Sequence, residues 1–118
     1  VQAAKIFDLC AKNIIDGYVC AHEITTLAYF LMKNHNDSSK VKYVLGELFD
    51  LFHIIPVTED ILRKALNSQI NNYEDAIIEI SSLKNEVNCI ITRNLSNFKN
   101  SNIKALSASE FLTLQSLQ

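Results

Sequence analysis

The chain has 118 residues, of which 48% are hydrophobic and 20% are charged. These values are typical of one folded domain with a single core, spanning residues 1–118, and they exclude a disordered chain. Thirteen acidic residues against eleven basic ones give a net charge of -2. A nucleic acid would therefore have to be held by local positive groups and by metal, because no general positive field attracts it.

Residue usage excludes several further classes of protein. Two glycines and one proline leave no glycine-rich phosphate loop, which excludes Rossmann-type and P-loop nucleotide binders. No apolar run approaches the roughly 20 residues that cross a bilayer, and Val1 leads directly into an amphipathic pattern, so we expect neither a membrane partner nor a secretory signal. The cysteines are odd in number and far apart in apolar segments, which predicts buried, reduced thiols in a cytoplasmic protein: Cys10, Cys20 and Cys89.

Helices and short strands alternate along the first half of the chain. The apolar spacing predicts helices over residues 2–15, 22–34 and 39–51, the last with Asp37 or Ser38 as its N-cap. Between them, GYVCA (17–21) reads as a short strand, and HIIPV (53–57) follows as a second strand with its proline at the end.

The same alternation continues in the second half. Thr58 is the predicted N-cap of a helix over residues 58–69, and a second helix is predicted for Tyr73–Glu86. NCIIT (88–92) is apolar without alternation, as expected of a strand covered on both faces. A short strand IKAL (103–106) precedes a last helix that starts after Ser107 or Ser109. The alternation predicts an α/β fold, a three-layer α/β/α sandwich with a mostly parallel sheet.

In the stretch Tyr73 to Phe98, YEDAIIEISSLKNEVNCIITRNLSNF, acidic and polar side chains stand next to a predicted helix start and a predicted strand end. A carboxylate pair opens its helix, an apolar strand follows, and polar side chains come directly after the strand. In open α/β sheets, ligands bind at this end of the strands. We therefore expect a polar site formed by the following residues: Asp75, Thr92, Arg93, Asn94 and Asn97.

This order of acid, helix, strand and TRN-x-x-N-F resembles the C-terminal half of a PIN domain, the fold of metal-dependent ribonucleases such as the VapC-type toxins. The earlier run AAKIFDLC…GYVCAHEITTLAYFL is similar to the family segment that precedes it, so the resemblance covers essentially the whole chain. The family opens with a strand bearing Asp-Thr-Asn, which lies in the middle of the sheet, and this strand is absent. The resemblance thus implies an N-terminally incomplete domain whose open place is filled by a rearranged strand or a neighbouring chain.

The resemblance also assigns roles to individual residues. Asp75 matches a family acid that binds metal, although an acid in a first helical turn also favours the helix dipole. Thr26 stands where the family has another acid, and Glu23, one turn earlier on the same face, either reaches the metal or complements the dipole. Asn94 matches a position that is Asp or Asn in the family, and Asn97 one that is usually Asp. Asp75, Asn94, Asn97 and Thr26 are therefore the expected catalytic group.

Alternatives stay open for the neighbouring residues. Arg93 either contacts phosphate through its guanidinium or is solvated, and Thr92 bonds within the site or caps the loop. Glu79 lies on the same helical face as Asp75, but we expect it at the surface. The histidines are scattered without ligand spacing, which argues against zinc: His22, His35 and His53. Four aromatic residues are expected in the core rather than in base stacking: Tyr18, Tyr29, Phe30 and Tyr43.

The resemblance implies an endoribonuclease that uses Mg or Mn, acts on RNA, is paired with an antitoxin protein and forms a homodimer. Because Asp75 is the one position-matched acid, we expect weak Mg or Mn binding and a weakly active or inactive chain. Two alternatives are a degenerate PIN domain that serves as a non-catalytic RNA-binding or protein-interaction module, and an unrelated α/β domain such as a receiver. Neither HIIPV nor NCIIT ends in the Asp that a receiver needs.

Overall fold

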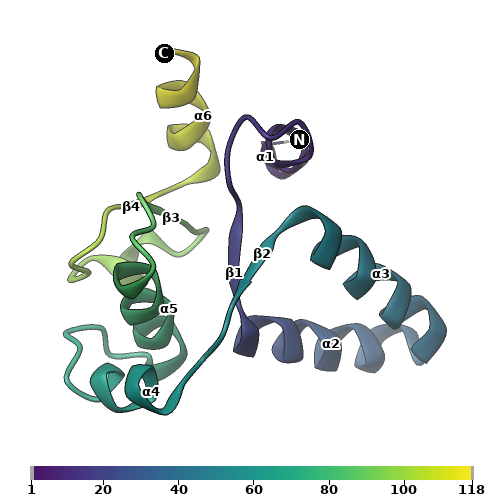
Figure 1. Cartoon of the computed structure of the whole chain (residues 1–118), viewed down its shortest axis with the longest axis horizontal. Coiled ribbons are helices and arrows are strands. Elements are labelled where there is room, and N and C mark those ends of the chain that lie inside the picture. Colours follow the sequence, from purple (N-terminus) through teal and green to yellow (C-terminus); the bar gives the residue numbers. More distant parts are fainter. Residues whose placement is uncertain (1, 118) are drawn as a thin grey trace.

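The computed structural model describes residues 2–117, and helices dominate it (Figure 1). The helices are α1 (Gln2–Ala11), α2 (Ala21–His35), α3 (Ser38–Leu51), α4 (Glu59–Ala65), α5 (Tyr73–Lys84), the short 3-10 helix η1 (Leu95–Phe98) and α6 (Ala108–Ser116). The strands are β1 (Tyr18–Cys20), β2 (His53–Ile55), β3 (Ile90–Ile91) and β4 (Ala105–Leu106). No helix within residues 2–117 has the length and apolar character that a bilayer span requires.

Local hydrogen bonds explain where most helices begin. The Asp37 carboxylate accepts from the backbone N–H groups at the start of α3, and the Thr58 hydroxyl accepts from the N–H of Ile61 in α4. Ser107 and Glu110 form a capping box at α6. Asp37 and Thr58 are thus confirmed as N-caps. Helix α1 is shorter than the predicted range 2–15, because Asn13 adopts the left-handed conformation (φ 59°), which an α-helix cannot continue through.

The four strands pair in parallel, as the alternation of strands and helices predicts, and the fold is α/β. Tyr18 of β1 lies opposite His53 of β2, and Ile90 of β3 lies opposite Ala105 of β4. The expected single sheet is divided, however, into a β1–β2 pair and a β3–β4 pair. The sheet is divided because no strand within residues 2–117 hydrogen-bonds to both the β1–β2 pair and the β3–β4 pair.

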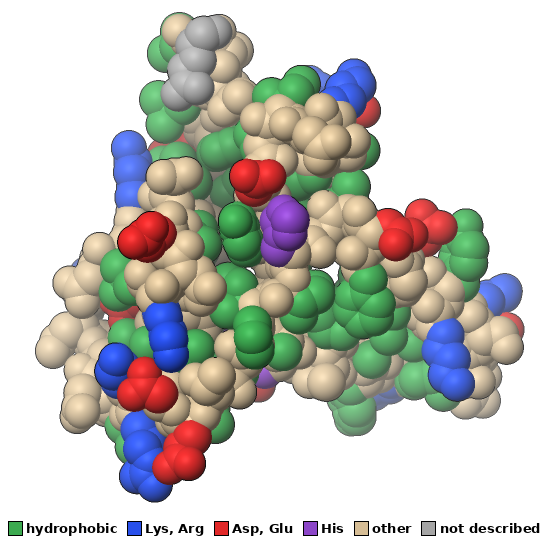
Figure 2. Space-filling model, viewed as in Figure 1, with side chains coloured by type: hydrophobic (Ala, Val, Ile, Leu, Met, Phe, Trp, Pro, Cys, Tyr) green, Lys and Arg blue, Asp and Glu red, His purple; other side chains and the backbone are tan. Residues whose placement is uncertain are grey.

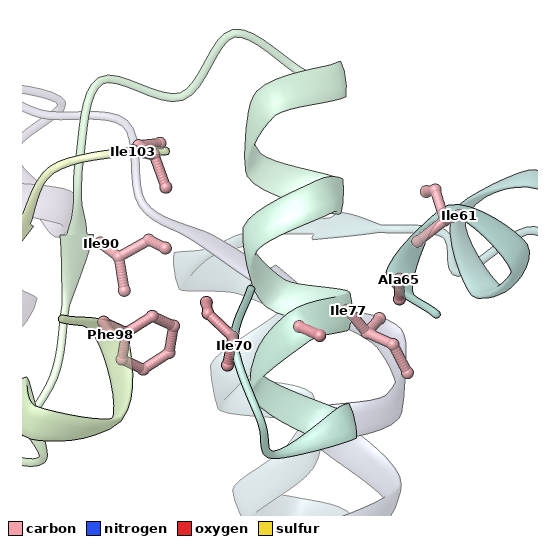
Figure 3. Close-up of a cluster of buried hydrophobic side chains, with 8 residues drawn as sticks. Ile61, Ala65, Ile70, Ile77, Ile90, Phe98 and Ile103 are labelled. Atoms are coloured by element: carbon pink, nitrogen blue, oxygen red, sulfur yellow. The ribbon is translucent and has the colours of Figure 1, made fainter. Parts of the chain in front are cut away.

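A buried apolar cluster holds the second half of the chain together around α5 (Figure 3). Its side chains come from α4, α5, β3, η1 and the intervening loops: Ile61, Ala65, Ile70, Ala76, Ile77, Ile90, Phe98 and Ile103. Phe98 is buried, and Leu83, near the end of α5, is exposed. We refer to residues 57–106 as the compact half.

Helices α2 and α3 pack against each other and extend away from the rest of the molecule (Figure 1). We refer to them, residues 21–51, as the arm. Its buried residues are Ile24 and Val41. The prediction that the aromatic residues lie in the core is wrong, since all four are exposed: Tyr18, Tyr29, Phe30 and Tyr43. Tyr29 and Phe30 of α2 and Tyr43 of α3 stay on the surface, because within residues 21–51 the packing of the two helices buries only Ile24 and Val41.

Candidate active site

The start of α5 presents a carboxylate at the edge of the buried cluster. The Asn72 side chain caps the helix by accepting the backbone N–H of Asp75 at 3.0 Å. Glu74 and Asp75 then lie in the first turn, where the helix dipole favours negative charge. Because α5 is anchored through Ala76 and Ile77, the position of Asp75 is set by the core of the compact half.

The loop after β3 meets this carboxylate. The Asn97 amide nitrogen, in η1, donates to Oδ2 of Asp75 at 3.2 Å. Burial raises the pKa of Asp75, the Asn97 hydrogen bond and the nearby His22 lower it, and the Glu74 carboxylate raises it. The structure therefore joins two of the residues that the sequence singled out, from segments 22 residues apart.

The first turn of α2 also reaches the start of α5, through a residue that the sequence did not single out. Nε2 of His22 lies 3.2 Å from the carbonyl oxygen of Glu74, which places a proton on Nε2 in the neutral ring. Nδ1 of His22 is buried and has no hydrogen-bond partner within residues 2–117. A usable signal existed, because His22 directly follows a strand end, where ligand sites form in α/β sheets.

Two further predicted residues of α2 are engaged within their own helix. The Thr26 hydroxyl donates to the carbonyl of His22 at 3.1 Å. Oε1 of Glu23 accepts the backbone N–H of Cys20 at 2.9 Å, so Glu23 caps the helix start. No hydrogen bond joins either residue to Asp75 among the described residues, and their catalytic and metal-binding roles stay predictions.

The turn after β3 holds the remaining predicted residues. The Thr92 hydroxyl accepts the backbone N–H of Asn94 at 3.0 Å, which is the local-cap alternative. Arg93 and Asn94 are exposed, and in the part of the chain that the structure describes, Arg93 makes no ion pair. Both side chains are free to contact a ligand beside Asn97.

Glu79 was expected at the surface, and that expectation is wrong. Its side chain is fully buried, with Oε1 accepting from the Ser68 hydroxyl at 2.6 Å and Oε2 from the backbone N–H of Asn102 at 2.7 Å. These bonds offset the cost of burying a carboxylate. Glu79 therefore ties α5 to two loops and does not extend an acidic patch around Asp75.

The thiols are free, as predicted. Cys10 and Cys20 are buried and Cys89 is half-buried. The pKa of Cys20 is raised to about 11, first by burial and then by the Glu23 carboxylate, while the neighbouring Ser81 hydroxyl of α5 lowers that pKa. The Ser81 hydroxyl is buried and has no hydrogen-bond partner within residues 2–117.

A small polar hollow adjoins Asn97. It has a volume of about 210 Å³ and is lined mainly by amide side chains: Gln69, Ile70, Asn71, Asn72, Ser96, Asn97 and Asn100. Amides both donate and accept hydrogen bonds but carry no charge. The hollow can therefore orient a polar ligand beside Asp75, and it adds no carboxylate for a cation.

The residues present do not form a divalent-metal site by themselves. Within residues 2–117 no group of three or more His, Cys, Asp or Glu side chains is arranged to hold an ion. Mg²⁺ is bound through carboxylates in near-octahedral geometry, and Asp75, already hydrogen-bonded to Asn97, supplies one carboxylate. At least one more acidic ligand is needed to complete such a site.

A family model matches most of the chain. The family model described as "PIN domain" matches residues 1–96, which is more than half of the chain and includes Glu23, Thr26 and Asp75. No curated protein and no solved structure is significantly similar. The extent of the family match shows that the chain belongs to the PIN domain family, whose members are generally nucleases.

Proposed function

We propose that this chain belongs to a VapC-like, metal-dependent endoribonuclease whose active centre lies at the start of α5. The contact between Asp75 and Asn97 carries the proposal, because it brings together the acid and the TRN-x-x-N-F loop of the family pattern. Asp75 is the proposed ligand for Mg or Mn. Asn97 holds its carboxylate in place, and Arg93 is the proposed phosphate contact.

We further propose that a strand bearing an acidic residue lies between β1 and β3 in the competent enzyme. Parallel sheets are normally covered on both faces and seldom consist of isolated pairs, yet here two parallel pairs stand apart. Both pairs reach α5, because the Cys20 thiol at the end of β1 lies near the Ser81 hydroxyl and Ile90 of β3 belongs to the buried cluster. A strand over α5 between them would end next to His22 and Asp75, where the missing carboxylate is needed.

The proposed biological setting is that of a toxin paired with an antitoxin protein, in a reducing cytoplasmic compartment where the free thiols persist. We also propose a homodimer, because apolar side chains stay exposed near both ends of the chain, among them Phe7, Ile14 and Leu114. Light scattering on dilute protein tests the dimer, and a monomeric mass at every accessible concentration would contradict it.

One observation favours a second function. With a single carboxylate in the site and Glu23 used as a helix cap, the chain has the features of a PIN domain that binds RNA or a protein without cleaving it. The two functions differ in one measurable respect. Addition of an acid-bearing strand restores cleavage in the first case and has no effect in the second.

The experiment is an RNA cleavage assay in Mg²⁺ and in Mn²⁺. The 118-residue chain is compared with a version that carries, before Val1, the strand ending in Asp-Thr-Asn from a catalytically competent PIN domain. We expect little or no cleavage by the first and clear cleavage by the second, because one carboxylate leaves the hydration of the cation largely unreplaced. Asp75→Asn in the extended version should abolish the activity.

The matched control is Asp50→Asn, an exposed acid of α3 far from Asp75 in the sequence, which should leave the activity of the extended version unchanged. Strong cleavage by the 118-residue chain that survives Asp75→Asn would show that the active centre lies elsewhere. An extended version that folds and remains inactive would support the non-catalytic alternative.

A further inference from the structure

One face of α2 runs from the candidate site to the far end of the arm. His22, Thr26, Tyr29 and Lys33 follow one another at intervals of three to four residues, so they share a side of the helix. Phe30 lies at the edge of this side, four residues after Thr26 and three before Lys33. The apolar residues that pack inward, such as Ile24, lie on a different side. With a rise of 1.5 Å per residue, this α2 face extends roughly 16 Å from His22 to Lys33.

Two aromatic rings dominate the middle of the α2 face. Tyr29 is 64% exposed and Phe30 is 52% exposed. Their rings pack edge to face with centroids 5.6 Å apart, so each ring supports the other without being covered. Exposed aromatic rings of this kind can stack on nucleic-acid bases, each of which has a flat face.

The charge at the end of the arm is opposite to that of the whole chain. Residues 29–43 contain three lysines, Lys33, Lys40 and Lys42, against one acid, Asp37, whereas the chain carries a net charge of -2. Asp37 is used to cap α3. None of the three lysines forms an ion pair within residues 2–117. Figure 2 shows lysines, acidic residues and apolar side chains interspersed over the arm.

We infer that the α2 face binds single-stranded RNA, with bases stacked on Tyr29 and Phe30, phosphates near Lys33, and one end of the bound segment at Asp75. The inference rests on the proposed function for the position of the cleaved bond. Two exposed rings beside the unpaired Lys33, with Lys40 and Lys42 on the neighbouring α3, match the flat bases and the charge of a single strand. A protein partner would instead be favoured by a continuous apolar surface, and the lysines interrupt this one.

The test is the affinity of the 118-residue chain for short labelled oligoadenylate and oligouridylate, measured by fluorescence anisotropy in EDTA so that no cleavage occurs. The double variant Tyr29→Leu/Phe30→Leu keeps apolar side chains and removes the aromatic faces. Since stacking contributes about 1–3 kcal/mol per base, we expect a roughly tenfold to hundredfold loss of affinity. Lys33→Gln should reduce the salt dependence of binding by about 0.7 in the log–log slope.

Matched controls come from α1. Phe7→Leu and Lys5→Gln change the same residue types on another exposed helix and should leave RNA affinity unchanged. Circular dichroism establishes that each variant is folded. Unchanged affinity in the folded double variant, a wild-type chain that binds neither oligonucleotide, or a change in the oligomeric mass of the double variant would each overturn the inference.

The same variants separate this inference from the proposed function. RNA binding in EDTA that depends on Tyr29 and Phe30, in a chain whose strand-extended version never cleaves, would support the α2 face and contradict the ribonuclease. Cleavage that depends on Asp75, with affinity indifferent to the two rings, would give the opposite result.

Discussion

The compact half and the arm both contain many apolar residues, but they bury these residues to different extents. In the compact half, apolar side chains from α4, α5, β3 and η1 converge on one buried cluster (Figure 3). In the arm, two helices bury little beyond Ile24 and Val41, and six large apolar side chains remain exposed: Tyr29, Phe30, Met32, Tyr43, Val44 and Phe49. The compact half also exposes large apolar side chains, such as Leu66 and Tyr73, but it buries a cluster of eight residues, whereas the buried residues of the arm are Ile24 and Val41.

The division affects the site as well, because the two regions meet there. Asp75 and Asn97 belong to the compact half, and His22 brings the start of the arm to the same point. The compact half therefore holds Asp75 in a fixed position, and the arm extends away from it. Such a division of roles is common in proteins that place a reactive group on a rigid scaffold and contact a long ligand beyond it.

The largest difference between the regions should appear in core truncations. Ile77→Ala removes a buried side chain from the cluster and leaves a cavity, so we expect a loss of about 2–5 kcal/mol in the free energy of unfolding. The corresponding change in the arm, Val44→Ala, should alter stability by no more than about 0.5 kcal/mol, because Val44 is exposed. Urea unfolding measures both, and similar losses would contradict the comparison.

A second, smaller effect is expected at Glu79. In Glu79→Gln one carboxylate oxygen becomes an amide nitrogen that cannot accept, so either the Ser68 hydroxyl or the Asn102 N–H loses its buried acceptor. We expect a cost of about 1.5–3 kcal/mol, the range for hydrogen bonds to charged groups. Asp50→Asn in the arm changes an exposed acid and should have little effect on stability. Equal stability of the two variants would mean that the Glu79 contacts are not formed in solution.

A third effect concerns the junction. His22→Ala removes the bond from Nε2 to the Glu74 carbonyl and should cost about 0.5–1.5 kcal/mol, together with faster amide hydrogen exchange at the start of α5. The control is His35→Ala, at the end of α2, where the side chain makes no hydrogen bond within the described residues. If exchange at α5 is unaffected by His22→Ala, the junction is held by other contacts.

Sequence reasoning succeeded where structure is determined locally. The strands, the helices and the caps at Asp37 and Thr58 depend on neighbours a few residues away. The parallel strand pairs also follow from the alternation of elements.

It failed where the deciding partner is distant along the chain. Glu79 is buried because Asn102, 23 residues later, approaches it, and His22 matters because Glu74, 52 residues later, does. The aromatic residues of the arm show a related limit. Helical spacing reveals which side chains share a face, as for Tyr29 and Phe30, but the sequence alone does not show which faces find a partner.

The smallest expected effect lies at Asp75. Burial raises the pKa of Asp75 above the usual value of 3.8. The native state therefore holds the proton more tightly than the unfolded chain does. Ionisation therefore reduces stability as the pH rises from about 3.8 through the native pKa. In EDTA, Asp75→Asn should be slightly more stable than the wild type at neutral pH, by less than about 1 kcal/mol because solvent screens a half-buried charge. The gain should disappear below that pH window. Unfolding curves across the acid range measure it, and a variant that is less stable than the wild type at neutral pH would show that Asp75 is held by favourable contacts rather than kept at a cost for function.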